Sequence, residues 1–242
     1  MFLAGAAGAI GRRLVPLLIQ SRCQVTGTTR SRERANELEH AGVTAAVLDV
    51  FEREAVMNAV RLARPEVVIH QLTDLPREFD EARIAASYGR NARIRMEGTR
   101  NLIAAARKAA VRRLIVQSIA FAYAAGSQPH SESDPLDISD PRRAVTVKGA
   151  IEMEQELLAQ RAMEVIVLRY GLLYGPGTWH REASRRPALH VDAAAHAALL
   201  ALTRGASGIY NIAEDEGLVS ITKARAELGF NPHFRLDCDM VC

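Results

Sequence analysis

The chain has 242 residues, of which 48% are hydrophobic, and 31 basic against 28 acidic residues give it a net charge of +3. This composition provides enough apolar material for one large domain, or for one domain with a small appendage. Basic residues are spread along the sequence and only 5% of residues are aromatic, which argues against a nucleic-acid partner. No apolar run approaches the roughly 20 residues that cross a bilayer, and no basic leader precedes the first apolar stretch, so we expect a cytoplasmic protein without a membrane partner.

The cysteines of the chain are Cys23, Cys238 and Cys242. An odd number cannot close a disulfide framework, and the spacing lacks the paired clusters that bind zinc. We therefore expect free thiols in a reducing compartment and no metal site.

Short apolar runs typical of strands alternate with segments of 3.6-residue periodicity from the start of the chain. This alternation predicts an α/β protein with a doubly wound parallel sheet of the Rossmann type, covered by helices on both faces. The expected strands cover 2–4, 25–28, 45–48, 67–70, 114–117 and 165–168, with one helix ending near 110 and another at 148–160.

The second half of the chain begins with a polar stretch. Residues 127–141 combine serine, proline and acidic residues, and predict a surface loop. After Gly177 the pattern changes to an alanine-rich helix at 191–203, a strand at 208–213 and a last helix at 220–229. These elements form the smaller C-terminal part.

The segment after the first expected strand is rich in glycine. Gly5 permits a tight turn from strand to helix, Gly8 lets the backbone approach a phosphate, and Gly11 lets the helix pack closely on its strand. The unpaired N–H groups of the first helical turn then face an anion. The pattern predicts that a dinucleotide pyrophosphate binds here. The expected contacts also include Ala7, Ala9 and Ile10.

The end of the second expected strand indicates which dinucleotide binds. Proteins that prefer NAD place an acidic residue there to bind the ribose 2′-hydroxyl. This chain has Arg30 followed by Ser31 instead, and a guanidinium matches the 2′-phosphate of NADP. We therefore expect NADP as the cofactor, with NAD as the second choice. Arg32 and Arg34 are interpreted as the solvated start of the next helix.

Two further strand ends are expected at the cofactor, because ligands of parallel α/β sheets bind outside the carboxyl ends of the strands. Asp49 and Val50 follow the third strand and are expected beside the adenine. Gln71, Leu72 and Thr73 follow the fourth strand and are expected beside the ribose and pyrophosphate.

Six fragments carry a family resemblance: GAAGAIG at 5–11, Asp49-Val50, VVIHQLT at 67–73, EGTRNLIAAARKAAVRRLIVQS at 97–118, LRYGLLYGPGT at 168–178 and HVDAAAHAALLAL at 190–202. In this order they resemble the extended and atypical short-chain dehydrogenase/reductases, or NAD-dependent epimerase/dehydratase family. The resemblance implies a doubly wound sheet, a bound nicotinamide cofactor and a small-molecule substrate pocket between the sheet and the C-terminal part. It places Tyr170 and Gly171 near the nicotinamide. Helices near 90–110 and 148–160 could form a homodimer bundle as in relatives.

The chain departs from this family at the proton-transfer residues. Typical members carry a tyrosine four residues before a lysine on the helix after the fifth strand, but here Ala144 stands at that spacing before Lys148. The resemblance assigns Lys148 to the cofactor ribose, and a solvated cation at a helix start is the open alternative. Ser118 matches one serine of the family and would bond a substrate carbonyl. Tyr123, in the following loop, is the candidate acid.

The C-terminal part shows a second departure. We interpret residues 1–178 as the dinucleotide-binding domain, with 190–213 packing on it, and 179–242 as a small substrate lobe. Few residues separate the YGPG turn from the HVD element, and 216–220 is similarly abrupt. Two explanations stay open: the lobe is abbreviated, or loops are missing from this sequence around 179–187 and 216–220. Within the HVD element we expect Asp192 to cap the N–H groups of a helix.

Two functional classes follow. The first is an NAD(P)-dependent oxidoreductase, or an enzyme of the epimerase/dehydratase type, that acts on a hydroxyl or carbonyl substrate, with a sugar-linked substrate as one option. The second is a sensor or regulatory protein that keeps the NADP site but has lost proton-transfer chemistry. The glycine loop and Arg30 argue against a purely structural module. Titration with NADPH and NADH distinguishes ligand-binding proteins from a structural one.

Overall fold

The computed structural model describes residues 1–76 and 78–237, so Cys238 and Cys242 lie outside the described residues. At its centre is a seven-stranded parallel sheet with the strand order β3-β2-β1-β4-β5-β6-β9. The order reverses between β1 and β4, which confirms the predicted doubly wound arrangement. The strands are β1 (Phe2–Ala4), β2 (Thr26–Thr29), β3 (Thr44–Val47), β4 (Val67–His70), β5 (Arg113–Ile119), β6 (Glu164–Tyr170) and β9 (Gly208–Ile212).

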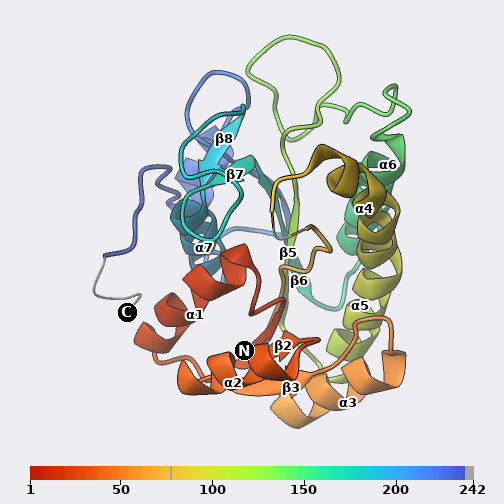
Figure 1. Cartoon of the computed structure of the whole chain (residues 1–242), viewed down its shortest axis with the longest axis vertical. Coiled ribbons are helices and arrows are strands. Elements are labelled where there is room, and N and C mark those ends of the chain that lie inside the picture. Colours follow the sequence, from red (N-terminus) through yellow and green to blue (C-terminus); the bar gives the residue numbers. More distant parts are fainter. Residues whose placement is uncertain (77, 238–242) are drawn as a thin grey trace.

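Helices cover both faces of the sheet (Figure 1). The side chains of β1 alternate between the two resulting cores: Leu3 packs in the core under α1, and Phe2 and Ala4 pack in the core under α3 and α5. The first face carries α1 (Ala9–Gln20), α2 (Arg32–His40) and α7 (Val191–Leu200), and the second carries α3 (Arg53–Ala63), α4 (Glu81–Arg93), α5 (Thr99–Lys108) and α6 (Ala144–Leu158).

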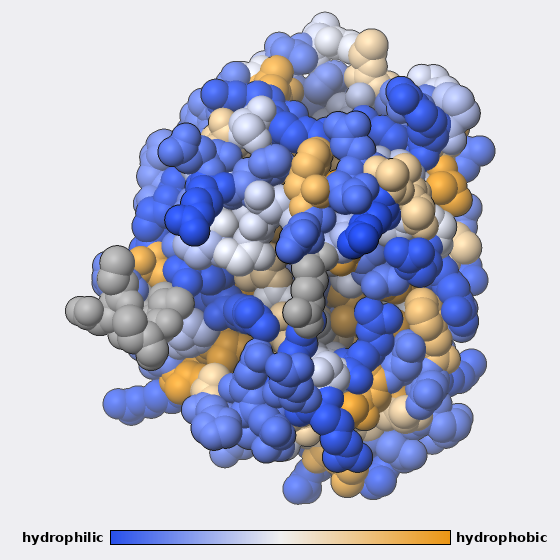
Figure 2. Space-filling model, in the orientation of Figure 1, coloured by the Kyte–Doolittle hydropathy of each residue, from blue (hydrophilic) through white to orange (hydrophobic). Residues whose placement is uncertain are grey.

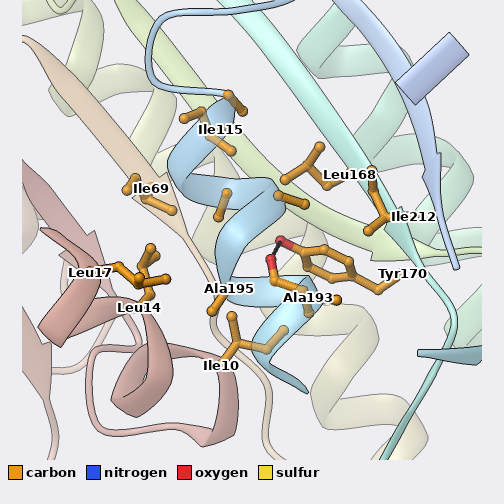
Figure 3. Packing of buried hydrophobic residues seen from close by; sticks show 14 of the residues in the cluster. Ile10, Leu14, Leu17, Ile69, Ile115, Leu168, Tyr170, Ala193, Ala195 and Ile212 are labelled. Carbon is orange, nitrogen blue, oxygen red and sulfur yellow. Dashed lines mark hydrogen bonds between the residues drawn. The ribbon is translucent and has the colours of Figure 1, made fainter. Parts of the chain in front are cut away.

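On the first face, α1 and α7 lie against each other above the sheet. Ile10, Leu14 and Leu17 of α1 are buried beside Ala193 and Ala195 of α7 (Figure 3). The alanines of α7 allow the two helices to pack closely, and each buried leucine or isoleucine contributes about 1.5–3 kcal/mol of hydrophobic stabilisation. This packing fixes the helix that follows the glycine loop.

On the second face, α4 and α5 are joined by a π-helical turn, η1 (Ile94–Gly98). The α4 segment packs beside α6, where Gly149 approaches Ala92 so closely that an added Cβ would lie 3.0 Å from the Ala92 Cα. A π turn adds one residue to the helix and changes the direction in which the following side chains point.

The C-terminal part adds a second, two-stranded parallel sheet. It pairs β7 (Leu172–Tyr174) with β8 (Ala188–His190). After α7 and β9, the last regular element is a π turn, η2 (Ala224–Leu228), which ends at Gly229 with φ +73°. With residues 222 and 223 before it, the helical segment covers 222–228, so the last helix expected at 220–229 is present and stops at the predicted glycine.

The expected strands are confirmed within a few residues of their bounds, and α6 begins earlier than expected. Its first residue is Ala144 instead of Lys148, because the Asp140 carbonyl accepts a hydrogen bond from the Ala144 N–H and the Asp140 carboxylate accepts one from Arg142. Residues 127–141 contain no helix or long strand, as predicted for a loop. Hydrophilic residues dominate the face shown in Figure 2, with scattered apolar side chains. None of the helices in the described part of the chain is long and apolar enough to cross a bilayer.

Candidate functional site

The glycine loop lies at the carboxyl end of β1 and passes close to two neighbouring strands. Gly5 has φ +90°, and an added Cβ would lie 2.7 Å from the carbonyl oxygen of Gln71, so only glycine is accommodated. The Gly5 N–H donates to the hydroxyl of Thr28 in β2. An added Cβ at Gly11 would lie 2.3 Å from the Gly5 carbonyl oxygen. Because Gly5 and Gly11 have no side chains, the loop can pack closely against β1, β2 and β4.

The first turn of α1 is arranged to receive an anion. Gly8 is the N-cap and makes no side-chain capping bond, and the first turn contains no acidic residue. Its early N–H groups have no partners within the helix and carry the positive end of the helix dipole. Ala9 and Ile10 form this turn, with Ile10 buried beneath it. These features match the site predicted for a pyrophosphate.

A pocket opens beside this turn, across the carboxyl ends of β1 to β4. The structure brings together there most of the residues predicted to bind the cofactor, whereas Ala9, Ile10, Gly11 and Ser31 support it from behind. The pocket is lined by Phe2, Ala4, Gly5, Ala7, Gly8, Thr28, Thr29, Arg30, Arg34, Leu48, Asp49, Val50, Phe51, Val56, Gln71, Leu72, Thr73, Ile94 and Leu102.

Two arginines line the end of the pocket next to β2. Arg30 is exposed, and its guanidinium pairs with Asp74 at 3.1 Å. Ser31 caps α2 by accepting from the Arg34 N–H, which turns this helix so that Arg34 also lines the pocket. Arg34 is partly exposed and lines the pocket, whereas Arg32 is exposed and does not line it, and their interpretation as the solvated start of α2 stays a prediction.

The floor of the pocket is apolar at the β3 side. Val50 and Phe2 are buried there, and Leu102 of α5 closes the base. Asp49 accepts a hydrogen bond from the Phe51 N–H, so its carboxylate shapes the loop that follows β3. Apolar side chains beside a loop carboxylate are compatible with an adenine ring, and the adenine contacts of Asp49 and Val50 stay a prediction.

At the end of β4, Gln71 has one unsatisfied polar atom. Its amide nitrogen lies 3.3 Å from the Tyr170 hydroxyl, but its buried Oε1 has no partner among the described residues. A buried acceptor without a donor is costly, so this atom suits a hydroxyl donor from a bound ribose. Together with the glycine loop, it shows that the residues fit a dinucleotide.

His70 precedes Gln71 and is fully buried. Its Nδ1 accepts from the Leu72 N–H, so its Nε2 carries the proton and donates to the Thr99 hydroxyl at 3.1 Å. Burial, together with the nearby Arg95, lowers the pKa of His70 to about 3. The imidazole is therefore neutral at physiological pH and fixes the end of β4.

The candidate catalytic residues Ser118 and Tyr123 belong to a buried network instead of the pocket. Strand register places Ser118, Arg169 and Asn211 in one row across β5, β6 and β9. Ser118 donates to Glu154 of α6 at 2.6 Å, and Glu154 forms a bidentate pair with Arg169. The Tyr123 hydroxyl accepts from Arg169 and donates to Asn211.

The charges of this network stabilise one another. Burial alone favours a neutral guanidine, but the bonds to Glu154 hold the pKa of Arg169 above its ordinary value. Burial raises the pKa of the Tyr123 hydroxyl. Because both polar groups are already bonded, Ser118 and Tyr123 hold the strand ends and the following loop together.

Lys148 is not brought together with these residues. It is exposed on the side of α6 that also carries the exposed Glu152 and Gln155, whereas Val147, Ala150 and Glu154 face the sheet. Residues three, four and seven apart share one face of a helix. The exposure of Lys148 is compatible with the solvated cation of the open alternative, and ribose binding by Lys148 stays a prediction.

Tyr170 and Gly171, expected near the nicotinamide, end β6 inside the first core. Tyr170 is buried, and its hydroxyl donates to the Ala194 carbonyl in α7 (Figure 3). Burial raises its pKa well above the ordinary value. At Gly171 an added Cβ would lie 2.8 Å from the Pro187 carbonyl oxygen, so the chain passes close to the segment that precedes β8.

The expectation that Asp192 caps a helix is wrong. His190 is the N-cap of α7, and its Nδ1 accepts from the Asp192 N–H. Asp192 instead forms a buried ion pair with Arg13 of α1 at 2.5 Å and accepts from the Leu236 N–H. The sequence pattern located this element but not the distant partner that uses its carboxylate.

Comparison with known proteins agrees with this geometry. A sequence model described as "NAD dependent epimerase/dehydratase family" matches residues 1–186. The chain belongs to this family. Family members use nicotinamide cofactors and include oxidoreductases and epimerases.

Individual relatives support both the chemistry class and the fold. A protein named "3-diazoavenalumate denitrifying reductase" from Streptomyces sp is 40% identical over 238 residues, which cover 89% of this chain and 76% of the relative. The UDP-glucose 4-epimerase of Thermotoga maritima, solved with UDP-glucose, superposes with a TM-score of 0.78 at 18% identity, over 99% of this chain and 96% of that one. The Thermus thermophilus UDP-glucose 4-epimerase, solved with NAD, gives a TM-score of 0.75 at 20% identity, over 99% and 96% of the two chains.

Among the described residues, no group of three or more histidine, cysteine, aspartate or glutamate side chains is arranged to hold a metal ion. The site is therefore described by its nucleotide pocket, the buried network and the carboxyl ends of the strands.

Proposed function

We propose that this protein is an NADPH-dependent reductase that transfers a hydride to an electrophilic nitrogen-bearing substrate, with a diazo or diazonium compound as the substrate class. The observation that carries this proposal is the relative named as a denitrifying reductase of a diazo compound, which shares 40% identity over 89% of this chain.

The choice of NADPH is supported by the β2 end of the pocket. Arg30 and Arg34 both line it, and no acidic residue ends β2. The pair between Arg30 and Asp74 is largely exposed, with 60% of the Arg30 side chain accessible. Exposed ion pairs contribute at most about 1 kcal/mol, so a 2′-phosphate can displace Asp74 with little penalty.

The reaction class agrees with the missing tyrosine. Bound NADPH would supply a hydride that forms a C–H bond at the carbon of a diazonium group, while the C–N bond breaks and its electron pair leaves with dinitrogen. No oxyanion forms in this reaction, so no side chain has to deliver a proton to one. Ala144 and the exposed Lys148 are then no obstacle to turnover.

The residues of this chain bind and orient the reactants. Gly8 and the first turn of α1 hold the pyrophosphate, and the unsatisfied Oε1 of Gln71 accepts from a ribose hydroxyl. Ser118 and Tyr123, predicted as catalytic, are proposed as positioning residues, because both are bonded within the network around Arg169.

Cofactor titration tests the nucleotide site. Arg30→Ala should weaken NADPH binding by about tenfold or more and leave NADH binding nearly unchanged, because only the 2′-phosphate contact is lost. Arg32→Ala is the matched control, since Arg32 lies two residues after Arg30, is exposed and does not line the pocket. Equal losses for both cofactors in Arg30→Ala would contradict the assignment.

Turnover is tested with NADPH and 4-carboxybenzenediazonium, with oxidation of NADPH followed at 340 nm and benzoate measured as the product. Enzyme-dependent benzoate formation above a protein-free blank is expected. Tight NADPH binding without reduction of this or any carbonyl compound would instead favour the sensor or regulatory protein considered from the sequence.

A hydroxyl or carbonyl substrate linked to a sugar is the second substrate class. The neighbours solved with UDP-glucose share 18% identity with this chain, a level that supports the fold alone. We also propose that the short lobe at 179–242 binds a small substrate. A homodimer through α4 and α6 is part of the proposal, because these helices lie side by side on one face.

A further inference from the structure

Arg95 has hydrogen-bond donors that the protein does not use. It lies in the π turn between α4 and α5, and its Nη1 donates to the carbonyl and the hydroxyl oxygen of Thr146 at 2.7 and 2.5 Å. Its Nε and Nη2 contact no acceptor within residues 1–76 and 78–237. The side chain is partly buried, and burial lowers its pKa to about 10, so it remains a cation at neutral pH.

The surrounding groups do not neutralise this charge. Glu154 is the carboxylate that acts on Arg95 electrostatically, but it is already bonded to Arg169 and Ser118. His70, on β4, is neutral because burial keeps its pKa near 3. A partly buried cation without a paired anion is unfavourable, so the site favours an incoming anion.

The position of Arg95 places this cation near the end of β4 and the first turn of α6. Ile94, the preceding residue, lines the nucleotide pocket, and Thr146 lies in the first turn of α6. Arg95 is thus at the side of β4 and β5, whereas Arg30 is at the other side of the pocket, at the end of β2. The π turn directs the guanidinium of Arg95 toward α6. Such turns are frequent at functional sites.

We propose that Arg95 and Thr146 form an anion subsite that binds a carboxylate group of the substrate next to the nicotinamide. Nε and Nη2 of Arg95 are the free donors of this subsite, and Nη1 is held in place by Thr146. The inference rests on the proposed reductase function and names its substrate class as an organic carboxylate. A phosphate of the cofactor is the other anion with this chemistry, and the experiment separates the two.

The test uses benzoate and benzamide, which share a shape but differ in charge, with the full chain saturated with NADPH. Binding is measured by calorimetry, independently of turnover. Benzoate should bind the wild type at least about tenfold more tightly than benzamide, and Arg95→Met should abolish this preference. Arg95→Lys should retain part of it, because the positive charge is kept. NADPH affinity should change less than about threefold in Arg95→Met.

Arg107→Met is the matched control, because Arg107 is exposed on the same helical run; it should keep the preference for benzoate. Circular dichroism and thermal unfolding show whether Arg95→Met is folded, and Arg95→Lys keeps the test valid if it is not. The proposal is overturned if benzoate and benzamide bind the wild type equally, or if Arg95→Met loses NADPH affinity instead of benzoate affinity. Loss of turnover without loss of benzoate binding would contradict only the reductase function.

Discussion

The two halves of the sheet's carboxyl edge are built in opposite ways. Over β1 to β4 the edge is open, and it is formed by glycines, free N–H groups and the unsatisfied Oε1 of Gln71. Over β5, β6 and β9 the edge is closed by side chains that bond one another, with Glu154 and Arg169 at the centre. Polar groups without protein partners can bind a ligand. Polar groups that bond one another instead keep the strand ends in a fixed arrangement.

The difference has a consequence for the chemistry. In the closed half, Ser118 and Tyr123 are held as part of the scaffold, so they position the strand ends and do not approach the pocket. Arg95, near the end of β4, has no ion-pair partner among residues 1–76 and 78–237. Substitutions in one half at a time should therefore distinguish effects on the free energy of unfolding from effects on cofactor binding.

The largest effect is expected from Glu154→Gln. It leaves the guanidinium of Arg169 buried without its anion, and loss of one partner of a buried pair costs about 3–5 kcal/mol. Chemical denaturation should show this loss in the free energy of unfolding, while the NADPH dissociation constant of the folded fraction stays nearly constant.

Glu164→Gln is the control for this variant. Glu164 also bonds an arginine, Arg113, but 48% of its side chain is exposed, so its removal should cost less than about 1 kcal/mol. Equal losses in the two variants would show that burial of the Glu154 pair does not determine its contribution.

A second, smaller loss is expected from Gly11→Ala in the open half. The new methyl group would lie 2.3 Å from the Gly5 carbonyl oxygen, and overpacking of this kind costs about 1–3 kcal/mol. Unlike Glu154→Gln, this variant should also weaken NADPH binding, because the glycine loop must move. Gly89→Ala, at an open helical position, should instead gain up to about 1 kcal/mol. Unchanged NADPH affinity in Gly11→Ala would break the distinction between the halves.

The smallest effect is expected from pH, at the boundary between the halves. The pKa of His70 is about 3 in the folded protein, against its ordinary value of 6.5. Below pH 6.5 the unfolded chain therefore binds a proton that the folded chain does not. Stability should fall by about 2 kcal/mol from pH 6.5 to pH 5 through this group. Unfolding of the wild type and of His70→Asn, measured over this range, should differ by this slope. Parallel pH dependences would exclude His70 as the source.

Much of the fold and of the open half follows from the sequence, because both depend on local patterns. Alternating apolar runs locate the strands, and the spacing of Gly5, Gly8 and Gly11 locates the pyrophosphate turn. Backbone geometry requires glycine at these positions, so the residue type alone carries the information. The Arg30 position follows in the same way from the end of β2.

The closed half could not be predicted, because its residues act through partners distant in the chain. Ser118 meets Glu154 and Tyr123 meets Asn211 only after β5, β6, β9 and α6 have assembled. Lys148 has the spacing of a motif, but the phase of α6 turns it outward, and four residues of sequence do not reveal that phase. The available signal was the spacing of Glu154, which places it on the same helical face as Val147, Ala150 and Leu157.

The buried carboxylate of Asp192 joins three remote stretches of polypeptide: Arg13 in the nucleotide-binding helix, its own helix α7 and the backbone at Leu236. The segment at Leu236 thus helps to fix α1, the helix whose first turn we propose to bind the pyrophosphate. Removal of Leu236 and the residues after it would expose the Asp192 carboxylate and weaken its contact with Arg13. A truncated protein should therefore lose nucleotide affinity even though every residue of the pocket is intact.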